Sequence, residues 1–502
     1  MAYNDDTCAL NTPRGAGENI TSCDTQFELA EMSELLFLNL EFLDDLTSST
    51  MKKLEEEEGF MYPDQKFMLT KVAISAGSFL HHAAPSTTYR ASELKCLQRV
   101  NSQLPLRSID VPYLLDFLAV ALCIAISRGY DLVVKRILTL PDIDINTRRA
   151  RDQSPLEMAL KNQQYYIFQL LLADPRTKIN QKNKLGQTLL HHAVEYRDLV
   201  AVQMLLAHDE IDVNSLNAEG DDVLLLAVAT YEEYLPGIGL LPIIERLIST
   251  PSINVNQQDS DGRSALWHAV DFGHKKLVEI FTRADHVDWN LPDHQGFTPL
   301  ARAAENGNLH MAGLLLLQSR VCVNAGLRRV VPPLWVACRA GQESIVSLLL
   351  DHNSININEK SPEGTSSLQV ALTMHHLPIV RLLLDQEGRL AINDQGPQCW
   401  TALIFAAAGG FCCAIDRLLA FPGIDIHSVD DCGRAALWWA AAGGHTECVK
   451  LLIKQPRLDV AARDFNHKSA MDVAKERGHW DTVGPLQAAA MWYFLLWTLC
   501  RR

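Results

Sequence analysis

Residues 256–290 read NQQDSDGRSALWHAVDFGHKKLVEIFTRADHVDWN, and this stretch sets the pattern for most of the chain. Gly262 follows a polar cluster and marks a tight turn that needs a positive φ. Ser264 stands where it can cap a short helix that carries the apolar Leu266. Gly273 ends that helix and a second apolar segment follows. We therefore predict a unit of turn, helix, turn, helix and short extended segment.

Such a unit is too small to bury its own apolar faces, so it must stack on copies of itself. The first-helix leucine recurs at Leu122, Leu156, Leu190, Leu224, Leu266, Leu300, Leu334, Leu368, Leu403, Leu437 and Met471. The spacing is 34 residues throughout, apart from one interval of 42 and one of 35. The closing asparagine recurs at Asn146, Asn180, Asn214, Asn256, Asn290, Asn324, Asn358 and Asn393, and then gives way to His427 and Ala461. A fixed period of this length predicts a solenoid.

Three segments carry a family motif: residues 296–304 (GFTPLARAA), 186–193 (GQTLLHHA) and 433–440 (GRAALWWA). With them the chain resembles the ankyrin repeat over residues 106–487. Endings such as Ile-Asp-Ile-Asn resemble a variant of fungal ankyrin proteins. The resemblance implies an all-α solenoid of about eleven helix-turn-helix repeats with β-turn fingers. We expect residues 488–502 to form an apolar capping helix or tail, because terminal repeats need a cap.

The regular pattern breaks in two ways. Asp152, Val330, Cys399 and Asn466 stand where the turn glycine is expected. Val330 is the hardest to fit because a β-branched residue resists positive φ, so we predict a remodelled turn at 328–331. Repeat four carries eight extra residues, 231–238, which we place between its two helices.

The N-terminal region follows another pattern. Residues 1–30 lack periodicity, and we expect a disordered acidic tail. Residues 31–46 predict an amphipathic helix that resembles the first helices of an F-box, although the usual Leu-Pro opening is missing. The alternative is a plain packing helix, since leucine-rich helical faces are common. Residues 31–105 as a whole are predicted to form a small helical region or linker.

Composition narrows the function classes. The net charge is −15, and residues 1–60 hold 14 acidic against three basic side chains, which is −11 and leaves −4 for the remainder. A nucleic-acid partner needs a basic surface, so we expect none. The 12 cysteines show no CxxC pair, which favours reduced thiols and a cytoplasmic location, with the nucleus as the alternative. The polar, acidic N-terminus does not resemble a signal peptide. The 13-residue apolar run Ala488–Cys500 is shorter than the ~20 residues that span a bilayer.

The chain carries no motif of a nucleotide-binding loop, a nucleophile elbow or a metalloprotease. We therefore predict no enzyme activity, no catalytic residue, no cofactor and no metal site. His191 and His192 could be read as metal ligands, but His191 stands where the ankyrin motif has a structural histidine. Cysteines crowd the ninth and tenth repeats, but without the paired spacing of a zinc site. Trp267, Trp335 and Trp438 share one repeat position and predict packing between repeats.

The resemblance implies protein binding through the concave face and the turn tips. We predict a basic end from Arg148, Arg149, Arg151, Lys182 and Lys184, and a second basic tip from Arg328 and Arg329. The acidic tips are Asp259, Asp261, Asp430 and Asp431, with Arg263, His268 and Arg434 beside them. Trp439 is predicted to be a binding anchor, because tryptophan is frequent at hot spots.

These features lead to two hypotheses of function. The first is a protein-interaction scaffold with an unidentified protein partner. The second is the substrate-recognition subunit of a ubiquitin ligase, whose residues 31–60 bind a ligase adaptor. The basic end further suggests that the acidic residues 1–60 bind there and inhibit the array. A membrane-surface role for the aromatic C-terminal run is the alternative to its role as a cap.

Overall fold

A computed structural model describes residues 119, 122–140, 143–148, 153–231, 239–324, 329–456 and 458–500. The chain divides into two compact units, residues 1–181 and 182–502. The predicted regions 1–30 and 31–105, with the F-box-like helix at 31–46, lie outside the described residues. Within the described ranges the named elements are all helices, which confirms the all-α class.

The first unit contains short helices that pair in sequence order. Residues 122–128 are helical and α5 follows at Asp131–Leu138, while α6 (Pro155–Lys161) precedes α7 (Tyr165–Leu172). Helix α7 packs against both α5 and α6. Leu122, the first of the predicted repeat leucines, is fully buried.

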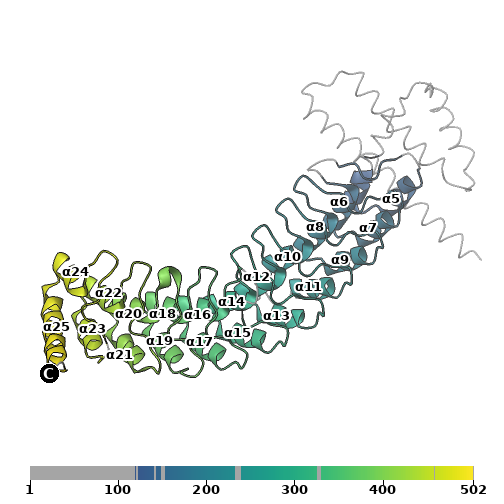
Figure 1. Ribbon diagram of the computed structural model, residues 1–502. Coiled ribbons are helices and arrows are strands. Elements are labelled where there is room, and N and C mark those ends of the chain that lie inside the picture. The colour runs from purple at the N-terminus through teal and green to yellow at the C-terminus, as the bar shows by residue number, and fades with distance from the viewer. Residues whose placement is uncertain are drawn as a thin grey trace, which may run out of the picture. The chain divides into compact units, whose positions relative to one another are not determined.

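The second unit continues the same pairing as two rows of helices (Figure 1). The first helices are α8 (Leu189–Glu195), α10 (Val223–Ala229), α12 (Ala265–Asp271), α14 (Pro299–Glu305), α16 (Pro333–Ala340), α18 (Ser367–Thr373), α20 (Ala402–Gly409), α22 (Ala436–Ala442) and α24 (Ala470–Glu476). The second helices are α9 (Leu199–Leu206), α11 (Leu240–Ile248), α13 (Lys275–Phe281), α15 (Leu309–Leu316), α17 (Glu343–Leu350), α19 (Leu377–Leu384), α21 (Cys412–Ala420), α23 (Thr446–Ile453) and α25 (Trp480–Cys500). Neighbours within each row contact one another, as α14 and α16 do, so the predicted solenoid is confirmed.

Short helices form here because most of the first helices begin with a side-chain cap and because the helices bury an apolar stripe. The Ser264 side chain accepts a hydrogen bond from the backbone N–H of Trp267, and Thr298 does the same for Ala301. Pro299 follows Thr298 at the first helical position, where its missing N–H removes no helical bond. Helices of this length are marginal alone, so their burial in the stack holds them.

An asparagine at the end of each regular repeat joins it to the next. Asn290 donates from Nδ2 to the carbonyl of Arg320 and accepts at Oδ1 from the N–H of Cys322, at 2.8 and 2.6 Å. The same pair of bonds is made within each unit by Asn146, Asn214, Asn256, Asn324, Asn358 and Asn393. The repeated asparagine is therefore a structural link between repeats.

The turns explain most of the glycine pattern and correct one assignment. Gly262 has a φ of 80°, as predicted. In the predicted remodelled turn, Arg329 takes the positive φ of 75° and Val330 is buried, so the prediction of a changed turn is confirmed. The placement of Asn466 at the glycine position was wrong, because His467 has the positive φ of 58°. Residue 152 lies outside the described ranges, and Cys399 does take a positive φ of 58°. A short 3₁₀ turn, η2 (Pro397–Cys399), precedes α20.

The insertion and the C-terminal boundary are also visible. The extra residues of repeat four fall between the end of α10 at Ala229 and the start of α11 at Leu240, as predicted. The boundary predicted at 487/488 falls inside α25, which runs unbroken from Trp480 to Cys500 and packs on α23 and α24. The predicted cap is thus the second helix of the last repeat, prolonged. Within the described residues, no helix combines the length and apolar character that crossing a bilayer requires.

Candidate functional site

A side-chain oxygen braces each regular turn beside the first helices. Oδ1 of Asp259 accepts hydrogen bonds from the backbone N–H groups two and four residues later, those of Asp261 and Arg263, at 2.9 and 2.8 Å. The residues that brace a turn in this way are Asn183, Asn217, Asp259, Asp293, Asp430 and Asp464. The glycine position lies three residues after each brace. This spacing places it at His467, three after Asp464.

In Asp259, the carboxylate oxygen that does not brace the turn binds a side chain on the following helix. Oδ2 of Asp259 lies 2.8 Å from Nε2 of His268, and the two side chains are 12% and 14% exposed. Burial alone would raise the pKa of Asp259, but the hydrogen bonds from Arg263 and His268 outweigh it and lower that pKa. Asp259 and His268, predicted to bind a partner, are therefore largely engaged with each other.

Asp430 makes the same use of its carboxylate with different partners. Its Oδ2 accepts from Nε of Arg434 at 2.8 Å and from Nε1 of Trp439 at 3.0 Å. The Asp430 side chain is 1% exposed, so it does not offer the acidic tip that was predicted. It instead fixes the orientation of Arg434 and Trp439.

One stretch of the first-helix face carries a chain of ion pairs, which we call the ionic patch. Arg302 on α14 lies 2.6 Å from both Asp271 of α12 and Glu305 of its own helix. Arg339 on α16 lies 2.6 Å from the other oxygen of Glu305. The Arg302 guanidinium also stands over the buried Trp267 ring, at 5.2 Å from its centroid. The charged side chains of three successive repeats therefore form ion pairs with one another.

A second stretch of the same face carries an aromatic cluster, which we call the aromatic patch. The rings of Trp400 and Trp439 lie 4.6 Å apart between centroids, and Trp400 lies 4.9 Å from Phe405. Arg434 stacks 4.4 Å above Trp439 and 5.1 Å above Trp438. Apart from the buried Trp438, all of these side chains are half-buried, so each keeps a part of its surface in water.

Small residues border the aromatic patch. Ala408 and Gly409 follow Phe405 on α20 by one turn, and Ala442 and Gly443 follow Trp439 in the same register. Gly409 and Gly443 are exposed. The rings of Phe411 and His445 fill the space beside these two glycines, so the missing side chains let the chain's own rings pack against the helix backbone.

Family comparison now gives the array its identity. The family model described as "Ankyrin repeats (3 copies)" matches residues 156–238, 237–326, 325–395 and 397–489, which is more than half of the chain. The chain belongs to the ankyrin-repeat family.

Two relatives agree with this assignment. The chain is 25% identical over 205 residues to "Ankyrin repeat domain-containing protein SAT10" of Stachybotrys chartarum, a match that covers 40% of this chain and 10% of that protein. It is 34% identical over 74 residues to "Putative ankyrin repeat protein L271" of Acanthamoeba polyphaga mimivirus, covering 15% of this chain and 10% of that protein. The chain thus spans about a tenth of the length of these curated relatives.

The ankyrin motif also explains the two polar residues buried between α8 and α10. Nδ1 of His191 accepts from the Thr188 N–H at 3.2 Å, and Nε2 faces the carbonyl of Asp221 at 3.3 Å. The structural reading of His191 is therefore confirmed, and burial lowers its pKa. Asp222 caps α10 through Oδ1, while its Oδ2 has no hydrogen-bond partner. Burial raises the pKa of Asp222 to about 6.

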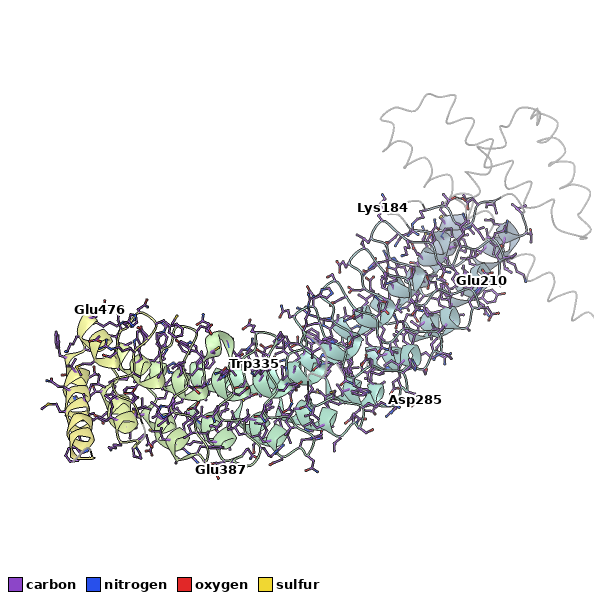
Figure 2. The ribbon with its side chains drawn as sticks, viewed as in Figure 1. Lys184, Glu210, Asp285, Trp335, Glu387 and Glu476 are labelled. Carbon is purple, nitrogen blue, oxygen red and sulfur yellow. The ribbon has the colours of Figure 1, made fainter. Side chains whose placement is uncertain are left out.

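The predicted basic surface is weaker than expected. Both oxygens of Glu157 accept from Arg148, at 2.6 and 2.8 Å, and the Arg148 side chain is 12% exposed. Arg148 is therefore a structural residue in its own repeat. Lys182 donates to the carbonyl of Leu216, and Lys184, labelled in Figure 2, is exposed. Arg149, Arg151 and Arg328 lie outside the described residues.

The remaining predicted residues are more accessible. Arg329 and Asp431 are exposed, and Asp261 is exposed while lying 3.0 Å from Arg263. Arg263 stands over Trp267 at 4.9 Å, as Arg302 does. The packing role predicted for Trp267, Trp335 and Trp438 is confirmed, since they are 2%, 8% and 8% exposed. Nε1 of Trp335 also donates a hydrogen bond to the hydroxyl of Thr365 in the next repeat. Trp335 is labelled in Figure 2.

Sequence reasoning missed several residues of the two patches. Phe405 stands 34 residues before Trp439 and so holds the same repeat position, as does Arg302. Trp400 stands 34 residues before Arg434, at the last turn position before the helix cap. Comparing these two positions across all repeats would have found both patches. The described residues contain no group of three or more His, Cys, Asp or Glu that could hold a metal ion.

Proposed function

We propose that this chain is a non-enzymatic interaction scaffold whose ankyrin repeats bind a protein partner through their first helices and turn tips. The aromatic patch is the anchor of that surface. The observation that carries the proposal is that Trp400, Phe405 and Trp439 are half-exposed in one cluster and are held in place by Arg434 and Asp430. Tryptophan and arginine in such clusters dominate binding energy at protein interfaces.

Preorganisation supports the same assignment. A ring that is already fixed loses little conformational entropy when a partner binds. Trp439 is fixed by its hydrogen bond to Asp430 and by the stacked guanidinium. The ionic patch is a poorer anchor, because its charges already pair with one another and a partner would have to replace those pairs.

Affinity purification with quantitative mass spectrometry tests the proposal. The full chain serves as bait beside Trp439→Ala and Trp400→Ala, with Phe272→Ala as the matched control. Phe272 is 52% exposed on the same face but lies on the repeat of the ionic patch. We expect both tryptophan variants to lose the same partner by tenfold or more, about 1.4 kcal/mol or beyond, while the control keeps it. Equal recovery with all four baits would contradict the proposal.

A finer alternative is the substrate-recognition role in a ubiquitin ligase. It rests on residues 31–46, which lie outside the described residues. Under that alternative the chain without residues 1–60 loses a ligase adaptor and keeps the partner of the aromatic patch. The proposed contact between residues 1–60 and the basic end predicts instead that this deletion changes the salt dependence of partner binding.

A further inference from the structure

Helix α25 has a buried face and an apolar face that no described part of the chain covers. Thr482, Val483 and Leu486 are buried against the last repeat. On the opposite side Trp480, Met491 and Trp492 are 67%, 62% and 65% exposed. Gly484 and Ala488 lie between them and are also exposed. At about 100° per residue these five positions share one side of the helix.

This face continues the interface between repeats. Along the array most second helices pack on the next, as α21 does on α23 and α23 on α25 (Figure 1). The outward side of α25 is where another second helix would lie. A terminal repeat usually turns a polar side outward to remain soluble. The large exposed residues here are apolar instead, so the side is suited to a further helix.

We propose that this face of α25 binds the same face of a second copy of the chain, with the two helices antiparallel. A two-fold axis then passes beside the midpoint of Gly484 and Ala488. Gly484 of one copy lies opposite Ala488 of the other, which lets the helices approach closely. We call the line along which the two helices meet the seam. Trp480 of one copy lies beside Met491 of the other, on the same side of the seam, because both residues lie at nearly the same distance from the axis. A contact made twice in this way is typical of isologous dimers.

The chemistry of the pairing is favourable. A thioether beside an aromatic ring is an attractive contact, and here it forms at both ends of the seam. The exposed carboxylate of Asp481 lies on the same side of α25. It disfavours an anionic membrane surface as the occupant, because like charges repel there.

Sedimentation velocity of the full chain over a wide range of concentration tests the dimer. We expect the mass to rise from one copy to two with concentration. Ala488→Glu puts two carboxylates beside the axis and should weaken the dimer by tenfold or more. Ala488 is exposed, so the fold should survive, which circular dichroism checks. Leu317→Glu is the matched control, since Leu317 is 79% exposed on another repeat and should leave the mass unchanged.

The register has its own readout. Trp480→Ala and Met491→Ala each break the same contact, so each should weaken the dimer. In the double variant the loss should be smaller than the sum of the two single losses, because the shared contact is lost only once. A chain that stays monomeric at every concentration overturns the proposal, as does an Ala488→Glu variant that dimerises like the parent. Binding of the monomeric chain to anionic vesicles, lost in Ala488→Glu, would assign the face to a membrane instead.

Discussion

The ionic and aromatic patches occupy the same face of the array and yet treat their side chains in opposite ways. The position four residues after the helix cap holds Arg302 in the ionic patch and Phe405 and Trp439 in the aromatic patch. Arg302 forms ion pairs with Asp271 of the neighbouring repeat and with Glu305 of its own helix. In the aromatic patch the rings stack in a cluster that stays half open to water.

The difference shows which parts of an ankyrin repeat are constrained by folding. Caps and turn glycines recur in most repeats, and the buried leucine in nearly all, because the turns and the short helices depend on them. The fourth position after the cap has no such structural role, so its residue type varies along the chain. Where it is charged, as at Arg302, the side chain forms ion pairs with neighbouring residues, and where it is aromatic, as at Phe405 and Trp439, the rings form a cluster. Four predictions test which of these positions folding constrains.

The largest effect is expected where two turns of the array differ in crowding. Gly296 has a φ of 90°, and a Cβ there would lie 2.1 Å from the carbonyl oxygen of Arg329. Gly364, in the turn before α18, has a φ of 84° with nothing within 4 Å of such a Cβ. We predict that Gly296→Ala lowers the unfolding free energy by about 3 kcal/mol or more, and Gly364→Ala by only about 1 kcal/mol. Urea denaturation of both variants measures the difference, and equal midpoints would contradict the clash.

Asp222, at the cap of α10, predicts a pH effect. Its folded pKa of about 6 lies above the ordinary value of 3.8, so the folded state disfavours the ionised form. Above pH 6 this costs stability, and the cost disappears as the pH falls from 6 toward 3.8. Asp222→Thr keeps the cap without the charge. It should stabilise the chain by about 2–3 kcal/mol at pH 7 and by nearly nothing near pH 4.

Thermal or urea unfolding of both proteins across that pH range measures the effect. Only the difference between the variant and the parent is compared, because other groups titrate in the same window. Burial lowers the pKa of His191, so its neutral form favours folding above its ordinary value of 6.5 and that gain is lost as the pH falls. A difference that stayed constant with pH would show that Asp222 is not the cause.

Arg302 tests the internal pairing of the ionic patch. Arg302→Met keeps much of the apolar stem over Trp267 but leaves Asp271 with Asn306 as its partner and Glu305 with Arg339 alone. The side chains are 19% to 30% exposed, so solvent screens part of the loss. We predict a loss of about 1–2 kcal/mol that shrinks at high salt, and unchanged binding of the partner of the aromatic patch. If Arg302→Met lost partner binding but kept its full stability, the ionic patch rather than the aromatic patch would be the binding surface.

The smallest effect is expected within the aromatic patch itself. Trp439→Phe keeps a ring but loses the hydrogen bond to Asp430, whose carboxylate retains Arg434 and the turn N–H groups. We predict a loss of about 0.5–1 kcal/mol in unfolding free energy. Partner binding should fall far more than stability does. A stability loss as large as that of Gly296→Ala would mean that Trp439 is part of the core.

Much of the fold could be read from the sequence because its causes are local and periodic. The leucines, caps and glycines predicted both helices of each repeat, the insertion after α10 and the changed turn at 328–331. The error at Asn466 came from counting glycine positions without the brace at Asp464, which fixes the turn. The cap boundary at 487/488 failed because nothing in the local sequence ends a helix there.

The sequence by itself determined the period, the family and the residues that each repeat must bury, since these follow from chain-local propensity and from the apolar pattern. Tertiary structure decided which polar side chains remain available. Arg148, Asp259 and Asp430 look like surface charges in the sequence, but each meets its partner only after the turn folds back on its helix. Trp400 and Trp439 look unrelated until neighbouring repeats stack and bring their rings together. That pairing depends on the distance between repeats, which the sequence of one repeat does not encode.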